Sequence, residues 1–130
     1  REVNASIGRD PANRLRMAVV DLATQSGKTA RTDIELLANG FAGCLVKCTL
    51  HTGRTHQIRV HMASIAHPLV SDSVYGGAEG AGMRRQALHA FQLGFIHPVT
   101  QQPLAFRSKL PPDFEGAMTQ WALHYNTAVN

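Results

Sequence analysis

The chain has 130 residues, a mass of 14.1 kDa and a formal net charge of +4, from 13 Lys and Arg against 9 Asp and Glu. This length fits one domain, and a hydrophobic fraction of 44% excludes global disorder. No apolar run approaches the ~20 residues of a membrane helix, and no signal-peptide pattern opens the chain, so we expect a cytoplasmic protein with no membrane role. Two Cys exclude a disulfide-rich secreted scaffold.

The charge balance indicates an anionic partner, because the sequence pI is near 9.6, although +4 is modest for a nucleic-acid binder. Arg outnumbers Lys by ten to three, and the planar guanidinium of Arg can bind two phosphate oxygens at once. The arginines gather at the start, the middle and near residue 85: Arg1, Arg9, Arg14, Arg16, Arg54, Arg59, Arg84 and Arg85. Solvated surface charges would give the same composition, so both interpretations stay open here.

The first half of the chain is predicted to be rich in strands. We expect a loop or extended arm over 1–16 and a short strand over 16–20. A polar turn over 25–28 precedes an alternation from Thr29 to Leu36 that is typical of a half-buried strand. Asn39-Gly40 is a hairpin-turn signal, and a longer strand is expected over 41–51.

The second half mixes helices and strands. Helical spacing begins at Thr55, an expected N-cap, places Ile58, Met62 and Ile65 on one face, and ends at His67-Pro68. A glycine-rich loop follows over 71–82. Alternation predicts strands over 91–95 and 104–108, joined by a turn over 97–103, and 114–122 follow a helical stripe. The pattern indicates the α+β class.

Metal and thiol chemistry find little support. Cys44 and Cys48 lie four residues apart on a predicted strand, which separates them by ~13 Å. One zinc ion held ~2.3 Å from each sulfur cannot bridge that span. We therefore expect no metal and interpret both cysteines as small core residues. No dinucleotide-binding or phosphate-cradling loop occurs, so no nucleotide cofactor is expected.

The densest polar cluster runs from Thr52 to Arg59, where the predicted strand ends and the helix begins. Gly53 permits a tight turn there, and a helix N-terminus favours an anion. Arg59 shares a helix face with His56. An Arg on a packed face requires a carboxylate or phosphate partner. The alternative is an ordinary solvated or core salt-bridge Arg, and the residues alone leave both open.

Two runs in this region carry a family resemblance: LHTGRTHQIRVH over 50–61 and AHPLVSDSVYGG over 66–77. They resemble the RluA-type pseudouridine synthases, whose pattern is close to TGR(T/S)HQ(I/L)RVH and then GHP(L/I)(V/L)GDxxYG. Further matches lie at 86–90, 95–98 and 110–114, and the runs 3–9 and 13–19 are similar to the branch that modifies large-subunit ribosomal RNA. Ala66 and Ser71 replace the family's usual Gly, and we expect loop adjustment rather than loss of the fold.

The resemblance implies an isomerase that converts uridine in ribosomal RNA to pseudouridine without cofactor or metal, in ribosome biogenesis. It also implies a mixed, mostly antiparallel sheet with flanking helices. The family's catalytic Asp lies in a His-Arg-Leu-Asp motif that this sequence lacks. We therefore expect 1–130 to be a single partial domain, the C-terminal half of a synthase catalytic domain, inactive alone and covered by a dimer partner or an N-terminal half. A non-catalytic RNA-binding module of the same fold is the alternative.

The same resemblance suggests roles for individual residues. Arg59 would be the catalytic-site residue that pairs with the absent Asp, keeping it ionised and oriented. Leu88 would be either an apolar shelf under the uracil or plain core. Arg54 would contact phosphate or stabilise the turn that His56 and Gln57 hold. The substrate-binding set is thus Leu88, Arg54, Thr55, His56 and Gln57. The RNA backbone would be contacted by Arg9, Arg14, Arg16, Arg84 and Arg85.

Overall fold

The computed structural model describes residues 1–40, 42–80, 82–90, 92–96, 103–107, 109–121 and 123. The elements in these ranges are β1 (Glu2–Asn4), β2 (Ile7–Arg9), β3 (Met17–Val19), β4 (Arg31–Asn39), β5 (Cys44–Leu50), α1 (Gln57–Ser64), the 3-10 helix η1 (Ser73–Tyr75), β6 (Gln92–Ile96), β7 (Pro103–Arg107) and α2 (Pro112–Gln120). All strand pairs in this part of the chain are antiparallel. The expected α+β class is confirmed.

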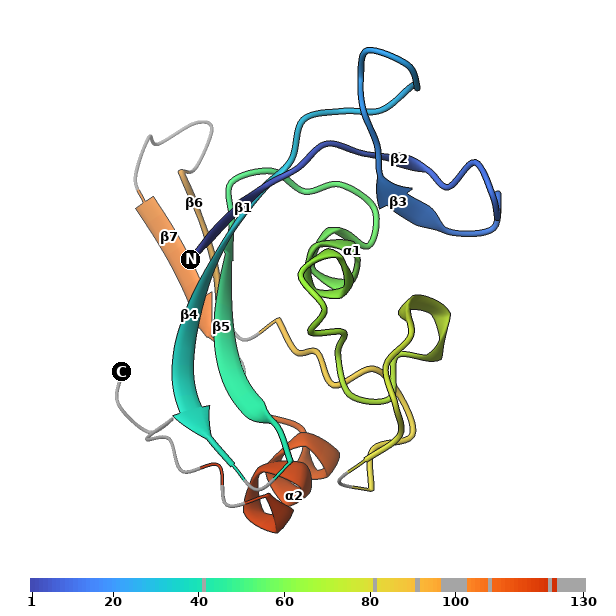
Figure 1. Ribbon diagram of the computed structural model, residues 1–130. Coiled ribbons are helices and arrows are strands. Elements are labelled where there is room, and N and C mark those ends of the chain that lie inside the picture. The colour runs from blue at the N-terminus through green and yellow to red at the C-terminus, as the bar shows by residue number, and fades with distance from the viewer. Residues whose placement is uncertain are drawn as a thin grey trace.

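A long hairpin of β4 and β5 forms most of the largest sheet, to one side of α1, with β1 along the outer side of β4 (Figure 1). Its pairing ends at Asn39 and Cys44, and the Gly40 amide donates to the Gly43 carbonyl at 2.8 Å. The predicted Asn39-Gly40 turn is therefore confirmed. The strand after it begins at Cys44 rather than at 41, because four residues instead of two close the hairpin.

The N-terminal arm is more structured than the sequence predicts. β1 pairs with β4, where Val3 lies opposite Thr32, and β2 pairs with β3, where Gly8 lies opposite Ala18. Strands of three residues are too short to show an alternation of apolar and polar side chains, and their partners come later in the chain. The predicted strand over 16–20 is confirmed as β3.

Helix α1 packs against β3, β4 and η1, over a core cluster of Ile7, Ala30 and Val60. The expected apolar face of Ile58, Met62 and Ile65 is wrong in detail. The buried residues of α1 are Gln57, Val60, His61 and Met62. Polar side chains are tolerated in this core because each finds hydrogen-bond partners there.

The start of α1 also differs from expectation. The N-cap is His56, in the left-handed conformation at φ 54°, and not Thr55. No side-chain hydrogen bond among the described residues caps this end of α1, and the Gln57 Oε1 instead accepts from the Arg54 amide, in the turn before the helix, at 2.9 Å. Beyond the helix, Ala66 and Ser71 have φ of 65° and 61°. The family pattern has Gly at both positions, and positive φ is the conformation that Gly adopts without steric cost.

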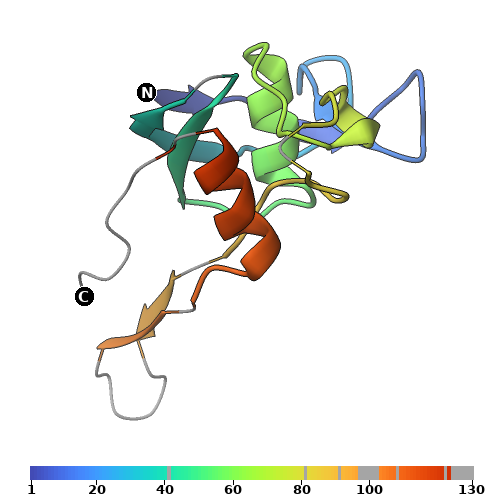
Figure 2. The same ribbon diagram turned by 90° about the horizontal axis from the view of Figure 1, so that it is seen from below.

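The C-terminal part folds back onto the hairpin. Helix α2 begins at Pro112, two residues before the predicted helical stripe over 114–122, and buries Met118. Trp121 lies at its end, between Gly43 of the β4–β5 turn and Gly80. The β6–β7 hairpin projects away from the rest (Figure 2). The predicted turn over 97–103 falls almost wholly on residues 97–102, outside the described residues. No helix in the described ranges combines the length and apolar character needed to cross a membrane.

Candidate active site

Arg59 of α1 forms a two-pronged ion pair with Asp72, which precedes η1. Its Nε donates to Oδ2 at 2.9 Å and its Nη2 to Oδ1 at 3.0 Å. The Asp72 side chain is 1% exposed and that of Arg59 is 13% exposed. The resemblance names an absent Asp as the partner of Arg59, and the structure adds Asp72 as an acidic partner within this chain. The core salt-bridge interpretation, left open by the residues alone, describes this contact.

The ring of Tyr75 completes the surroundings of this guanidinium. The Arg59 Cζ lies 5.0 Å from the centroid of the Tyr75 ring, a cation–π distance. The Tyr75 hydroxyl accepts from the Met17 amide of β3 at 3.1 Å and is joined to His56 Nδ1 at 2.8 Å. Three separate segments therefore meet at Tyr75, and they fix Arg59 against one side of the helix.

These contacts shift the acid–base equilibria of two groups. The hydrogen bonds that Arg59 donates to Asp72, reinforced by the charge of that carboxylate, raise the pKa of Arg59, so this guanidinium keeps its charge throughout the accessible pH range. Partial burial, together with the positive charge of Arg59, lowers the pKa of His56 below its ordinary value of 6.5. The site thus presents a fixed cation beside a neutral imidazole at pH 7.

The buried side chain of Gln57 holds the turn before α1 through hydrogen bonds. Its Oε1 accepts from Thr52 Oγ1 at 2.7 Å as well as from Arg54, and its Nε2 donates to the Arg31 carbonyl and to Thr32 Oγ1, both at 2.9 Å. Gln57 is only 3% exposed. With its amide fully engaged inside the protein, the geometry favours the turn-holding role for Gln57 over a direct substrate contact.

His61, one turn further along α1, extends this network. It is fully buried and lies between Thr32 Oγ1 and the Ala5 carbonyl, each at 2.8 Å. The carbonyl can only accept, so Nε2 of His61 carries a proton. This polar core ties α1 to β4 and to the segment after β1.

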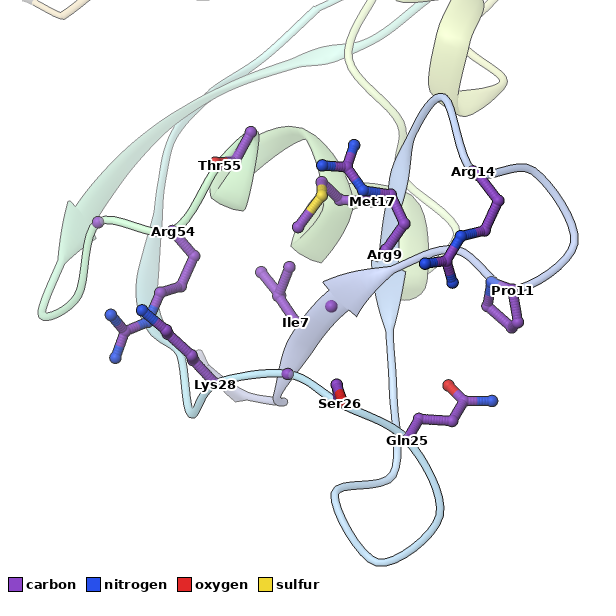
Figure 3. A pocket seen from close by; sticks show the side chains of 13 residues that line it. Ile7, Arg9, Pro11, Arg14, Met17, Gln25, Ser26, Lys28, Arg54 and Thr55 are labelled. Carbon is purple, nitrogen blue, oxygen red and sulfur yellow. The ribbon is translucent and has the colours of Figure 1, made fainter.

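A groove of about 720 Å³ opens beside this cluster, between β2, the segment before β4 and the turn before α1 (Figure 3). It is lined by two of the arginines expected at the RNA backbone, Arg9 and Arg14, and by two residues of the expected substrate-binding set, Arg54 and Thr55. Met17 also lines it and connects it to the Arg59 site through the bond of its amide to Tyr75.

Two other arginines expected at the RNA backbone are engaged in ion pairs. Arg16 donates from Nε to Asp10 at 2.8 Å and from Nη1 to the Val74 carbonyl at 3.1 Å. Arg85 forms a two-pronged pair with Asp113 of α2, at 3.0 and 3.2 Å. Much of their charge is neutralised by these carboxylates, and both side chains connect separate segments. Arg84 lies exposed beside Arg85.

Leu88 is half-buried, in the segment that Arg85 holds by donating to the Leu88 carbonyl at 3.0 Å. The neighbouring Ala87 amide donates to Val70 at 2.9 Å, two residues before Asp72. No hydrogen bond within the described ranges joins Leu88 to Arg59. The structure therefore brings together Arg59, His56 and the groove residues, and it leaves Leu88 attached through the backbone.

Three residues of the site carry no prediction from the sequence. Asp72 and Tyr75 both lie in the quoted second run, and only a turn that folds back onto α1 brings them to Arg59. Lys28 lines the groove beside Arg54, and the sequence presents it only as part of a polar turn. No group of three metal-ligating side chains occurs among the residues that the structure describes.

Comparison with known proteins supports the resemblance. A sequence model of the family described as RNA pseudouridylate synthase matches residues 3–64. A ribosomal large subunit pseudouridine synthase D of Nitrosomonas europaea is 50% identical over 119 residues, covering 85% of this chain and 33% of that protein. An uncharacterized RNA pseudouridine synthase of Bacillus subtilis is 45% identical over 111 residues, covering 85% and 35%.

A solved structure of a pseudouridylate synthase domain has a similar fold. The human RNA pseudouridylate synthase domain containing 1 matches with a TM-score of 0.68 and 30% identity, over 90% of this chain and 51% of that one. The chain spans about a third of the length of the curated relatives it matches. Together with the two runs that meet at Arg59, these likenesses show that the chain belongs to the RluA-type RNA pseudouridine synthase family.

Proposed function

We propose that this chain forms the arginine-bearing half of an RNA pseudouridine synthase that acts on large-subunit ribosomal RNA in the cytoplasm. The observation that carries the proposal is the fixed guanidinium of Arg59, held by Asp72 and Tyr75 beside a basic groove. The names of the relatives in several bacteria add the substrate class.

The reaction is an isomerisation and consumes no oxidant or reductant. The bond between ribose C1′ and uracil N1 breaks, the uracil turns, and a bond forms between C1′ and C5. The proton on C5 leaves and N1 gains one, so atoms and electrons balance. The uridine must leave its stack to be reached, as in other enzymes that modify a base. A carboxylate that acts at the ribose or base would come from residues outside this sequence, which holds no His-Arg-Leu-Asp motif.

Arg59 would hold that carboxylate charged and in place. Asp72 accepts from its Nε and Nη2, and no hydrogen bond among the described residues uses its Nη1. A second carboxylate that approaches Nη1 would meet a cation whose direction is already set by Asp72 and the Tyr75 ring. Such preorganisation keeps the pKa of the incoming acid low and costs little conformational entropy. Leu88 remains our candidate for the apolar shelf under the uracil.

The incomplete site also predicts a covering partner. The sheet of the described residues ends at β1 on one side and β5 on the other, and Leu36 and Leu50 are 56% and 47% exposed. Open strand edges and exposed apolar side chains favour association. We propose that an N-terminal half of the catalytic domain covers this sheet, with dimerisation of the chain as the alternative.

Tritium release from RNA labelled at uridine C5 tests the proposed function. The full chain is assayed alone and after fusion to the N-terminal part of a relative that carries His-Arg-Leu-Asp. We expect release only from the fusion, and expect Arg59→Ala to lower it by at least about 10²-fold with little change in RNA affinity. Lys47→Ala, which removes a cation from β5, is the control and should leave turnover intact.

A fusion that binds RNA but releases no tritium would overturn the proposal. The basic groove would then favour the second candidate, a non-catalytic RNA-binding module of the same fold. Loss of RNA affinity in Arg59→Ala, with the remaining bound RNA still modified, would show instead that Arg59 contacts RNA and has no pairing role.

A further inference from the structure

The groove beside the Arg59 site carries an arrangement of charge that the isomerisation does not use. Its lining includes four cations, Arg9, Arg14, Lys28 and Arg54, and no acidic side chain among the described residues. They come from three segments that lie far apart in the sequence: β2 with its following loop, the residues before β4, and the turn before α1. A volume of about 720 Å³ is in the range of sites that enclose a ligand.

The four groove cations differ from the arginines whose charge is compensated by an ion pair. Arg16, Arg31, Arg59 and Arg85 each have a carboxylate partner. Within the described part of the chain, none of the four groove cations has one. Uncompensated positive charge that converges on a concave surface attracts anions.

The groove is also held in shape before any ligand binds. Ile7 and Lys28 exchange two backbone hydrogen bonds of 2.9 Å, which fix the segment of Lys28 to β2. The Arg54 Nε donates to the Thr29 carbonyl at 2.8 Å, which fixes that guanidinium next to Lys28. A preformed cationic pair loses little conformational entropy when it binds phosphate.

The cations divide between the two ends of the groove (Figure 3). Lys28 and Arg54 lie side by side at one end, and Arg9 and Arg14 lie toward the other. Between them the floor of the groove includes the uncharged side chains of Ile7 and Met17. Two cationic ends around an uncharged floor match successive phosphates of one strand, with a ribose or base between them.

We infer that this groove binds single-stranded RNA through at least two phosphates, one at Lys28 and Arg54 and one at Arg9 and Arg14. The inference rests on the proposed function and deepens it, since the strand next to an extruded uridine is unpaired. Met17 links the two sites, because its side chain lines the groove and its amide bonds to the Tyr75 hydroxyl beside Arg59. Arg16 and Arg85 do not line the groove, and each is held in an ion pair.

Binding of a fluorescein-labelled single-stranded oligouridine RNA to the full chain tests the inference, by anisotropy over a range of salt concentrations. Two double variants, Lys28→Ala with Arg54→Ala and Arg9→Ala with Arg14→Ala, each remove two groove cations. The matched control, Arg1→Ala with Lys47→Ala, removes two cations elsewhere. We expect each groove variant to weaken binding at least tenfold and to lower the slope of log K against log salt by about 1.4, at about 0.7 for each single-strand contact.

The control should keep both the affinity and the slope. The single variant Lys28→Ala guards against misfolding, because the Lys28 side chain makes no hydrogen bond or ion pair among the described residues, and it should lower the slope by about 0.7. Equal losses in the control and the groove variants would overturn the inference, as would groove-dependent binding of duplex RNA with none of the single strand. Tritium release by the fusion that carries His-Arg-Leu-Asp separates the two proposals. Turnover by the fusion with groove-independent binding sinks this inference alone, and groove-dependent binding without turnover by the fusion sinks the proposed function alone.

Discussion

Asp72 presents both carboxylate oxygens to one edge of Arg59, at 2.9 and 3.0 Å, from a position that is 1% exposed. Arg85 and Asp113 repeat this two-pronged geometry at 3.0 and 3.2 Å, but their side chains are 42% and 43% exposed. These two Arg–Asp ion pairs thus have the same geometry, but one is buried and the other lies at the surface. Burial removes the screening by water that weakens a surface pair.

Asp72→Asn should therefore destabilise the chain far more than Asp113→Asn. An uncompensated Arg59 in a largely buried site costs on the order of 3 kcal/mol of unfolding free energy. The surface pair contributes much less, because water and salt solvate Arg85 once Asp113 is changed. Urea unfolding of the two variants at equal ionic strength measures the difference, and similar losses of stability in both would contradict the account of Asp72.

His56 should titrate below its ordinary pKa of 6.5, because burial and the charge of Arg59 disfavour its protonated form. The unfolded chain then binds the proton more readily than the folded one. This contribution to stability is present above pH 6.5 and is lost as the pH falls toward the folded-state pKa. NMR titration of the His56 ring measures that value.

The variant Arg59→Ala tests whether the charge of Arg59 contributes to the lowered pKa of His56. It removes a positive charge and leaves Asp72, whose charge raises the pKa of His56, so we expect the value to move up. Arg85→Ala, on the α2 side of the molecule, should leave it unchanged. A His56 pKa that stays the same in Arg59→Ala would mean that burial alone sets it.

Ala66→Gly should stabilise the chain. Ala66 has φ of 65°, where its Cβ is strained and Gly is not, and relief of this strain exceeds the added freedom of Gly in the unfolded chain. We expect a gain of about 0.5–1 kcal/mol in unfolding free energy. Ser71, with φ of 61°, is the matched case, because Ser71→Gly also loses the hydrogen bond from Oγ to the Met83 carbonyl. That loss, about 1 kcal/mol, should cancel the gain; a larger gain at 71 than at 66 would contradict this balance.

Gly43→Ala and Gly80→Ala should both loosen the attachment of α2. A Cβ at either position would lie within 2.6 or 2.7 Å of the Trp121 ring, closer than atoms pack. Overpacking of this kind costs about 1–3 kcal/mol. Gly116→Ala is the control, because nothing lies within 4 Å of its Cβ and Ala favours a helix by about 1 kcal/mol. Thermal unfolding followed by circular dichroism should rank Gly116→Ala above the parent chain and the other two below it.

Elements with a local signal could be predicted from the sequence, and contacts between distant segments could not. The β4–β5 hairpin follows from Asn39-Gly40 between two alternating runs, and α2 follows from its helical stripe over 114–122, although the helix itself begins at Pro112. The strands β1 and β2 carry no periodicity of their own, and only their pairing with β4 and β3 defines them. The spacing of apolar residues predicts the position of α1. It does not predict the buried side of the helix, because that side includes the polar residues Gln57 and His61.

The candidate site divides in the same way. Arg59 is evident from its spacing in a conspicuous polar run, and the need for a carboxylate follows from the cost of burying its charge. Which carboxylate fills that need depends on a turn at Ser71 and Asp72 that brings the chain back to α1, and no local pattern encodes the direction of such a turn. Lys28 enters the groove through the same kind of long-range placement, by its backbone bonds to Ile7.

Trp121 is the only tryptophan of the chain, and Gly43 and Gly80 bring two distant segments against its indole ring. Its intrinsic fluorescence therefore reports on one joint, where the end of α2 meets the hairpin turn and the loop beyond η1. Binding of a second polypeptide to the sheet, or release of α2 from it, would shift that emission without any attached dye. During unfolding, the emission of Trp121 would show whether this joint separates before or after the rest of the chain unfolds.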